Sequence, residues 1–281
     1  MYRKRINLFF LLLLLLGLNI LCGNGFAAIK IKLATGEWDP LTGAKIKNYG
    51  LFSEIVTASF ENQGEYIAEF SFFPWARCEE NVRKGEFFAA FPYTPTAERG
   101  KEFIFSDPVL ATKTFLYYNA GREGIKEKIG DENSWGDPEL PMMADGKIDM
   151  IEKLKKFSLG GIIGYFYEEA FKSAGLKVDF STTENMAFKK LLVGRIELQP
   201  QEQLIVQKLI DNDVSLQKTK FSYIRRPFSA TNLSLMVQRF TPGHKNYPES
   251  DKILKAFNQG LAQIKKNGIY QSILKKHGLL P

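Results

Sequence analysis

The feature that most limits the fold of this chain is a regular alternation of strand and helix patterns. Apolar residues recur at every second position in residues 29–33 and again in residues 66–72, which is typical of half-buried strands. Apolar residues at helical spacing predict helices at 51–60 and 76–84, and a further strand follows at 87–91. When each strand is followed by a helix, the helix returns the chain across the sheet and the next strand pairs in parallel with the first. This order therefore favours a mostly parallel sheet covered by helices.

A second round of the same alternation follows, and the C-terminus is strongly helical. The predicted elements are helices at 151–154, 168–174 and 183–191, strands at 159–163, 178–180 and 196–198, and C-terminal helices at 253–264 and 270–274. Residues 121–146 are polar and rich in Gly, Pro and Asp, so we expect a surface excursion of the second lobe there. Two rounds in 281 residues, at roughly 150 residues per domain, predict two α/β lobes rather than one large sheet.

The first 27 residues have the three parts of an export signal. A basic start at residues 3–5 precedes an apolar run at 8–18, and small residues frame a cleavage site after Ala27. The run is shorter than the roughly 20 residues of a spanning helix, so we expect export to the periplasm rather than an uncleaved anchor. Lipid attachment at Cys22 is the less favoured alternative, because Leu21 stands where that processing requires a small residue.

Charge and cysteine content exclude several classes of protein. The formal net charge of +7 falls to about +4 without the leader, and the other basic residues are scattered among acidic ones rather than gathered into a nucleic-acid-binding stripe. Beyond the leader only Cys78 remains, so no internal disulfide can form, and we expect a half-buried structural thiol. His244 and His277 leave no metal-ligand cluster, and no nucleotide-binding glycine loop is present, so we expect neither metal nor cofactor.

Two tryptophans stand where predicted strands end. Trp38 follows the strand at 29–33, and Trp75 follows the strand at 66–72. Because ligands of open α/β sheets bind beyond the carboxyl ends of the strands, these rings are candidates for the flat apolar walls of a shared pocket. The alternative for Trp38 is a core residue.

A threonine and an arginine form a candidate anion site. Pro95 suits the first turn of a helix, which would leave Thr94 as its capping residue with free backbone N–H groups nearby. Arg99 lies five residues beyond Thr94, and its planar guanidinium can bind both oxygens of a carboxylate. The alternative is a solvated Arg99 that pairs with Glu98 or Glu102.

Further candidates lie in the second round of elements. Residues 160–167 (GGIIGYFY) run from a strand into a helix start, where glycines allow close approach of a ligand and Tyr165 and Tyr167 add aromatic rings. Glu202 follows the last predicted strand of this round, and a carboxylate there that faced Arg99 would suit a zwitterion. The alternative is an ordinary surface glutamate.

Taken together, these residues give a chain that resembles the bacterial extracellular solute-binding proteins of family 3, the polar amino acid type of periplasmic binding protein. The resemblance is carried by residues 33–38 (LATGEW), 74–77 (PWAR), 94–99 (TPTAER), 105–108 (FSDP), 194–197 (GRIE) and 257–278. It implies the type II periplasmic-binding-protein-like fold, with two α/β lobes, a two-strand hinge and the ligand cleft between the lobes. The implied division is a signal peptide at 1–27, a first lobe at 28–111 and 232–281, and a second lobe at 112–231.

The resemblance also implies roles for the candidate residues. The arginine that matches Arg99 holds the α-carboxylate of the ligand, with help from the residue that matches Thr94. An acid that matches Glu202 holds the α-amino group, and Trp38 falls near an aromatic residue that stacks on the ligand side chain. Glu202 stands where Asp is usual, and the turn at 164–167 is more aromatic than the usual version, which leaves the identity of the ligand open.

We therefore expect a monomeric, non-catalytic protein that captures an amino acid or a related zwitterion and delivers it to an inner-membrane ABC permease. The alternative is an enzyme of the cyclohexadienyl or arogenate dehydratase type, with Glu202 as its acid if burial raised the pKa of that carboxyl. A sensor module of a larger receptor is less favoured, since the sequence ends at Pro281 without a following signalling segment.

Overall fold

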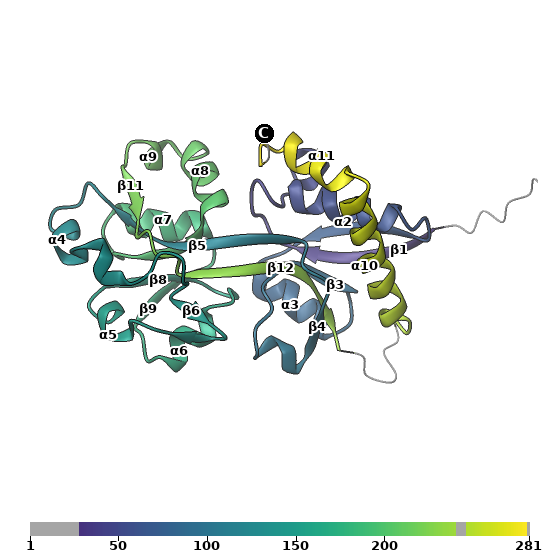
Figure 1. The fold of residues 1–281 in the computed structure, drawn as a ribbon, viewed down its shortest axis with the longest axis horizontal. Helices are drawn as coiled ribbons and strands as arrows, with labels where there is room; N and C mark the ends of the chain where they lie inside the picture. The colour runs from purple at the N-terminus through teal and green to yellow at the C-terminus, as the bar shows by residue number, and fades with distance from the viewer. Residues whose placement is uncertain (1–27, 240–245, 280–281) are drawn as a thin grey trace, which may run out of the picture.

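The computed structural model describes residues 28–239 and 246–279; the predicted leader, Cys22 and His244 lie outside the described residues. Figure 1 shows two lobes connected by two long strands, β5 (Leu110–Asn119) and β12 (Ser229–Gln238), which pair antiparallel with each other. The predicted fold of two α/β lobes with a two-strand connection is confirmed. The prediction that there is no single large sheet is wrong, because β5 and β12 join strands of both lobes into one ten-stranded sheet. The residue boundaries of the lobes stay a prediction.

The first lobe combines the start and the end of the described chain (Figure 1). Its elements are β1 (Ile29–Thr35), α2 (Leu51–Glu61), β2 (Tyr66–Phe72), α3 (Trp75–Arg83), β3 (Ala89–Tyr93), β4 (Phe103–Phe105), α10 (Ser250–Lys266), α11 (Ile269–Lys276) and the 3-10 helices η1 (Lys47–Tyr49) and η2 (Arg99–Lys101). Strand β1 pairs in parallel with both β2 and β3, as the alternation predicts. Strand β12 runs antiparallel beside β3, so the sheet is mixed.

The second lobe lies between the two connecting strands in the sequence. Its elements are α4 (Ile125–Ile129), η3 (Glu132–Trp135), β6 (Met143–Ala144), β7 (Lys147–Ile148), α5 (Ile151–Leu154), β8 (Leu159–Ile162), α6 (Glu168–Ser173), β9 (Val178–Ser181), α7 (Glu184–Leu192), β10 (Gln199–Glu202), α8 (Gln203–Asp211), α9 (Val214–Gln217) and β11 (Phe221–Tyr223). The main sheet has the order β10-β5-β12-β3-β1-β2, and β8 and β9 form a separate parallel pair. The predicted cap of α7 is confirmed, because the Thr183 hydroxyl accepts the Met186 N–H at 3.3 Å.

Two predictions about the second lobe are wrong. The strand predicted at 196–198 lies at Gln199–Glu202, where four buried residues of polar or proline type pair antiparallel with β5. Residues 121–146 do not lie only on the surface. Trp135 is fully buried, and its Nε1 donates to the Ile129 carbonyl oxygen at 3.1 Å. Sparse apolar residues in a polar stretch are the ones that pack into the core.

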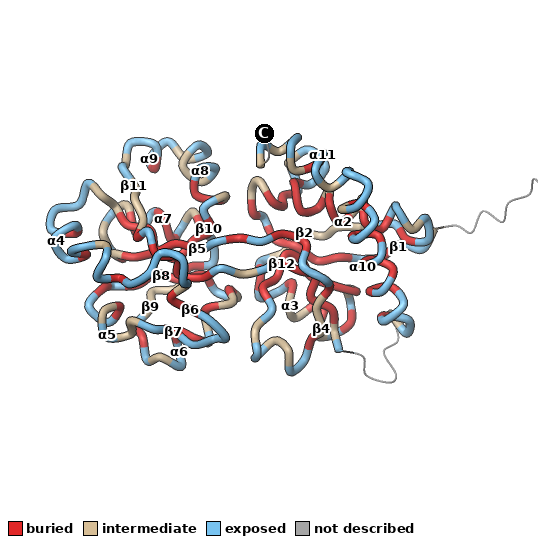
Figure 2. Tube along the Cα trace, viewed as in Figure 1, coloured by how far each residue is buried: buried red, intermediate tan, exposed pale blue. Residues whose placement is uncertain are grey.

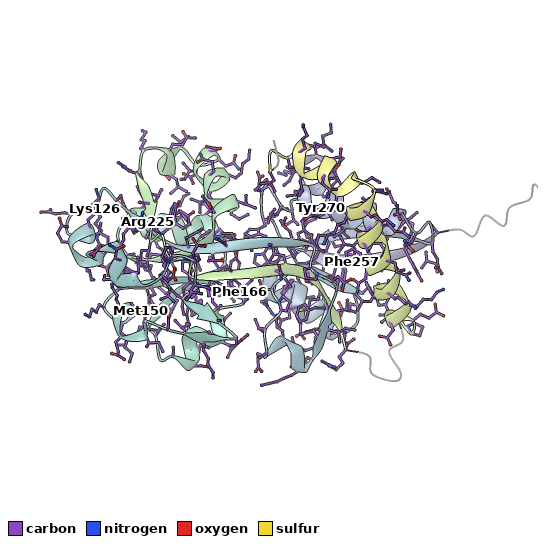
Figure 3. All side chains as sticks on the ribbon, in the orientation of Figure 1. Lys126, Met150, Phe166, Arg225, Phe257 and Tyr270 are labelled. Atoms are coloured by element: carbon purple, nitrogen blue, oxygen red, sulfur yellow. The ribbon has the colours of Figure 1, made fainter. Side chains whose placement is uncertain are left out.

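Each lobe has buried strands covered by helices, as the burial of the chain shows (Figure 2). In the first lobe, Phe257 of α10 packs against Phe60 of α2 with ring centroids 5.2 Å apart. Figure 3 labels Phe257 on this helix. Cys78 of α3 is completely buried rather than half-buried, and burial raises the pKa of its thiol to about 12. This thiol is therefore a structural part of the core.

Candidate functional site

Residues from both lobes meet in one cavity. It is lined by Trp38, Trp75, Pro92, Tyr93, Thr94, Arg99, Gly164, Tyr165, Phe166, Glu202 and Leu233. The space between these side chains is about 320 Å³, including the part that is open to solvent. Six of the seven predicted site residues line this cavity, and Tyr167 does not.

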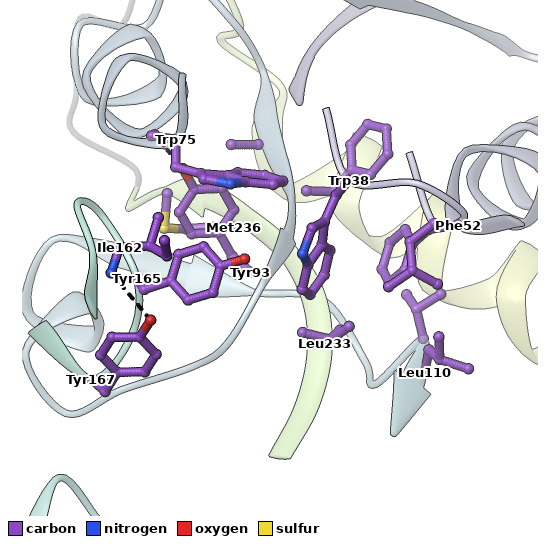
Figure 4. Close-up of a cluster of buried hydrophobic side chains, with 14 of the residues drawn as sticks. Trp38, Phe52, Trp75, Tyr93, Leu110, Ile162, Tyr165, Tyr167, Leu233 and Met236 are labelled. Carbon is purple, nitrogen blue, oxygen red and sulfur yellow. Dashed lines mark hydrogen bonds between the residues drawn. The ribbon is translucent and has the colours of Figure 1, made fainter. Parts of the chain in front are cut away.

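Three aromatic rings form an apolar wall of the cavity (Figure 4). Trp38 and Trp75 of the first lobe lie edge to face, with ring centroids 5.8 Å apart. Tyr165 of the second lobe lies 6.3 Å from Trp38 and 6.5 Å from Trp75, again edge to face. The buried indole N–H of Trp38 has no hydrogen-bond partner among the described residues, which leaves a donor for a ligand.

Arg99 begins η2, and its side chain is 10% exposed. Its Nη1 donates to the carbonyl oxygen of Thr94 at 3.1 Å, and its Nη2 donates to the carbonyl oxygen of Gly164, in the second lobe, at 2.7 Å. The Nε donates to a carboxylate oxygen of Glu79 at 3.2 Å. A guanidinium has five N–H groups, so these three contacts leave two for a ligand.

Thr94 takes part in the site in a different way from the predicted helix cap. No helix begins at Pro95; instead the Thr96 hydroxyl accepts the backbone N–H of Arg99 at 3.1 Å, and a short 3-10 turn follows. Thr94 is buried, and its carbonyl oxygen rather than its hydroxyl contacts Arg99. The prediction is wrong because the hydroxyl two residues later supplies the local turn contact.

Glu202 lies at the end of β10 and is 1% exposed, so it is not a surface glutamate. One carboxylate oxygen accepts from the Thr114 hydroxyl on β5 at 3.2 Å, and the other accepts from the Gln201 amide at 3.0 Å. Burial raises the pKa of Glu202 to about 8, and the nearby carboxylate of Glu184 adds to the rise. Among the residues that the structure describes, no cation pairs with Glu202.

Glu184, the first residue of α7, is a buried acid next to the cavity that the sequence patterns do not single out. Its Oε1 accepts from the Tyr165 hydroxyl at 2.7 Å and from the Trp75 indole at 3.3 Å. Burial raises the pKa of Glu184, and both hydrogen bonds oppose that rise. The Thr183 cap predicts where the helix starts. No local pattern in the sequence predicts that Glu184 contacts Trp75, which lies 109 positions earlier in the chain.

Tyr167 belongs to the core of the second lobe. It is completely buried, and its hydroxyl accepts the backbone N–H of Ile162 at 3.2 Å. Its ring packs against Phe171 and Phe228 with centroids 5.1 and 6.0 Å away. The predicted position of Tyr167 in the pocket is therefore wrong, because the turn after β8 directs Tyr165 into the cavity and Tyr167 into the core.

Direct contacts between the lobes show that the cleft is closed. Besides the Arg99–Gly164 and Trp75–Glu184 hydrogen bonds, the Asn212 amide donates to the Asp39 carboxylate at 3.3 Å. Gly164 has φ +84°, and a Cβ atom there would lie 2.9 Å from the backbone nitrogen of Ala76 in the first lobe. Only a glycine fits this contact between the two lobes.

Two further properties concern the whole described chain. Residues 28–239 and 246–279 contain no group of three or more His, Cys, Asp or Glu side chains placed to hold a metal ion. Within the same residues, no helix is both long enough and apolar enough to cross a bilayer.

The family described as bacterial extracellular solute-binding proteins, family 3, matches residues 35–279. None of the curated proteins matches the chain.

Several solved structures have a similar fold. An ancestral arginine-binding protein bound to arginine has 18% identity and a TM-score of 0.64, covering 88% of this chain and 97% of its own. The substrate-binding protein of an amino acid ABC transporter has 17% identity and a TM-score of 0.65, covering 88% and 98%. An ancestral amino acid-binding protein, a precursor of cyclohexadienyl dehydratase, has 17% identity and a TM-score of 0.62, covering 88% and 94%.

Proposed function

Because the chain belongs to family 3 of the bacterial extracellular solute-binding proteins, we propose that it captures an amino acid or a related zwitterion between its lobes. We propose further that residues 1–27 direct export to the periplasm and that the mature monomer delivers its solute to an inner-membrane ABC permease. The observation that carries the proposal is that Arg99 of the first lobe and Glu202 of the second lobe line the same cavity.

The two charged residues match the two ends of an amino acid. Arg99 has two free N–H groups for the α-carboxylate. An α-ammonium beside Glu202 would lower the pKa of that carboxyl from about 8, so that Glu202 could accept from the ammonium as a carboxylate. Charges taken out of water need partners, and each end of a zwitterion would supply one. The indole N–H of Trp38 would give the ligand a further donor.

Calorimetry on the mature chain, residues 28–281, tests this proposal. A thermal-shift screen of amino acids, organic acids and amines identifies a binder, whose dissociation constant is then measured for Arg99→Ala and Arg83→Ala. Both arginines bond Glu79, but only Arg99 lines the cavity, so Arg83→Ala is a matched control. We expect Arg99→Ala to weaken binding by roughly 30-fold or more and Arg83→Ala to change it little. Unchanged affinity in Arg99→Ala would contradict the proposed role of Arg99.

One observation favours a second function, a dehydratase that acts on cyclohexadienyl acids. With a pKa of about 8, Glu202 carries a proton at neutral pH and could protonate a leaving hydroxyl, while Arg99 holds a substrate carboxylate. Incubation of the pure protein with prephenate or arogenate, followed by detection of the aromatic product, tests this function. Turnover that disappears in Glu202→Gln would support it, and absence of turnover would exclude it.

A further inference from the structure

A single oxygen atom of Glu184 joins two aromatic rings that belong to different lobes. Its Oε1 accepts the indole N–H of Trp75, in the first lobe, at 3.3 Å and the hydroxyl of Tyr165, in the second lobe, at 2.7 Å. Both rings line the cavity, and their centroids are 6.5 Å apart. Glu184 is 7% exposed and is not part of the cavity lining, so its effect on a captured solute passes through these two rings.

Each ring is also held within its own lobe. A Cβ atom on Gly36 would lie 2.8 Å from the ring of Trp75, so this ring packs directly against the backbone of the first lobe. The Tyr165 hydroxyl accepts from the side-chain amide of Gln201, also in the second lobe, at 3.4 Å. The bond from Trp75 to Glu184 is different, because it crosses from one lobe to the other. It therefore exists only while the lobes are closed.

The bond from Trp75 does not require a charge on Glu184. Burial raises the pKa of this carboxyl, which favours its neutral form. A neutral carboxyl keeps a carbonyl oxygen with two lone pairs, and Oε1 is the one atom that accepts from both rings. A buried polar group that loses its hydrogen-bond partner costs free energy. Glu184 therefore favours the closed arrangement, in which both donors reach the same oxygen.

We propose that Glu184 is a positioning residue that assembles the aromatic wall of the cavity and stabilises the closed lobes around a captured solute. The inference rests on the proposed capture of an amino acid and assigns a part in it to a residue that does not contact the solute. Because the bond from Trp75 forms as the lobes close, its loss should speed the dissociation of the solute and leave the association rate almost unchanged.

Two substitutions at position 184 separate the hydrogen bonds from the side chain that makes them. Glutamine has the shape of the neutral carboxyl and keeps an oxygen that accepts from both rings, whereas leucine is of similar size and has no acceptor. Stopped-flow kinetics and calorimetry on the mature chain use the standard L-amino acids as probes, and the tightest binder is carried forward to the variants.

We expect Glu184→Gln to keep the wild-type dissociation rate within about twofold and Glu184→Leu to raise it about 3- to 10-fold. Glu152→Leu is the control, because Glu152 also lies in the first turn of a second-lobe helix but is exposed and bonds Lys155. Glu152→Leu should retain the wild-type rates.

Trp75→Phe tests the other end of the bond, since phenylalanine keeps an aromatic ring and lacks the indole N–H. It should also speed dissociation with little change in association, and it carries the test if Glu184→Leu does not fold. In a double-mutant cycle, Trp75→Phe should weaken binding about threefold less in the Glu184→Leu background than in the wild type, which a general loss of stability would not produce.

Three results would overturn the inference while leaving amino acid capture intact. They are a wild-type dissociation rate in Glu184→Leu, equal weakening by glutamine and leucine at position 184, and additive effects in the cycle with Trp75→Phe. Absence of binding of every standard amino acid by the wild type would overturn both the inference and the proposed function.

Discussion

Gly164 provides a test of whether closure of the lobes and ligand binding are linked. It follows β8 at the edge of the cavity, with φ +84°. A Cβ atom at this position would lie 2.9 Å from the Ala76 nitrogen and 3.2 Å from the Trp75 Cβ. Both neighbours belong to α3 in the first lobe, so alanine at 164 would clash only when the lobes are closed.

The expected magnitude follows from two separate costs. The left-handed backbone costs an alanine about 1–2 kcal/mol in the open and the closed protein alike, so this term lowers stability but not affinity. The clash acts on the closed protein alone and forces the lobes apart beside the 2.7 Å hydrogen bond from Arg99 to the Gly164 carbonyl oxygen. Loss of a hydrogen bond to a charged group costs about 1.5–3 kcal/mol, which raises the dissociation constant roughly 10- to 100-fold.

Calorimetry with the amino acid that binds the wild type measures this effect, with Gly175→Ala as the control. Gly175 has φ +63° and also lies in the second lobe, but a Cβ atom there meets no atom within 4 Å. Gly175→Ala should therefore lower the melting temperature without changing affinity, whereas Gly164→Ala should change both. Wild-type affinity in Gly164→Ala, or equal weakening in the two variants, would refute the link between this contact and binding.

Two other predictions concern pH and packing. Because the pKa of Glu202 is about 8 in the folded protein, the folded chain retains a proton that the unfolded chain loses above its ordinary pKa of 4.5. The free energy of unfolding should fall as the pH rises from about 4.5 to about 8. Urea denaturation at several pH values should show a shallower fall in Glu202→Gln than in the wild type. Equal dependence of the unfolding free energy on pH in the two proteins would contradict the raised pKa of Glu202. A Cβ atom on Gly260 of α10 would lie 1.9 Å from the Ser59 carbonyl oxygen of α2, so Gly260→Ala should cost about 1–3 kcal/mol and lower the melting temperature by several degrees. Gly100→Ala, where no atom lies within 4 Å, should melt like the wild type, and equal melting temperatures of the two variants would contradict the packing argument.

Much of the fold follows from periodicity in the sequence. Alternating apolar residues predict β1 and β2, and the 17-residue helix α10 follows from apolar residues three and four positions apart. Strand β10 is different, because its residues Gln-Pro-Gln-Glu have no apolar pattern and are buried by pairing with β5 and by contacts with β8, α7 and α8. A local pattern cannot predict an element whose environment comes from a distant strand.

The residues of the candidate site also differ in whether the sequence predicts them. Trp38, Trp75 and Arg99 follow strands or turns whose ends can be predicted, and the structure places all three in the cavity. Glu184 cannot be found by such reasoning, because an acid in the first turn of a helix is common and favourable in itself. Its importance depends on Trp75, which reaches it from the other lobe.

The first lobe contains both early and late parts of the chain, and this has a consequence for the order of folding. Helix α10 covers α2, β12 pairs with β3, and the hydroxyl of Tyr270 in α11 bonds the carbonyl oxygen of Val109. As the ribosome works from the N-terminus, Phe60 can pack early against Tyr66 but lacks its partner Phe257 until the last part of the chain has been made. The second lobe is continuous in sequence and can mature earlier, so the unfinished first lobe is the stage at which a chaperone would be needed.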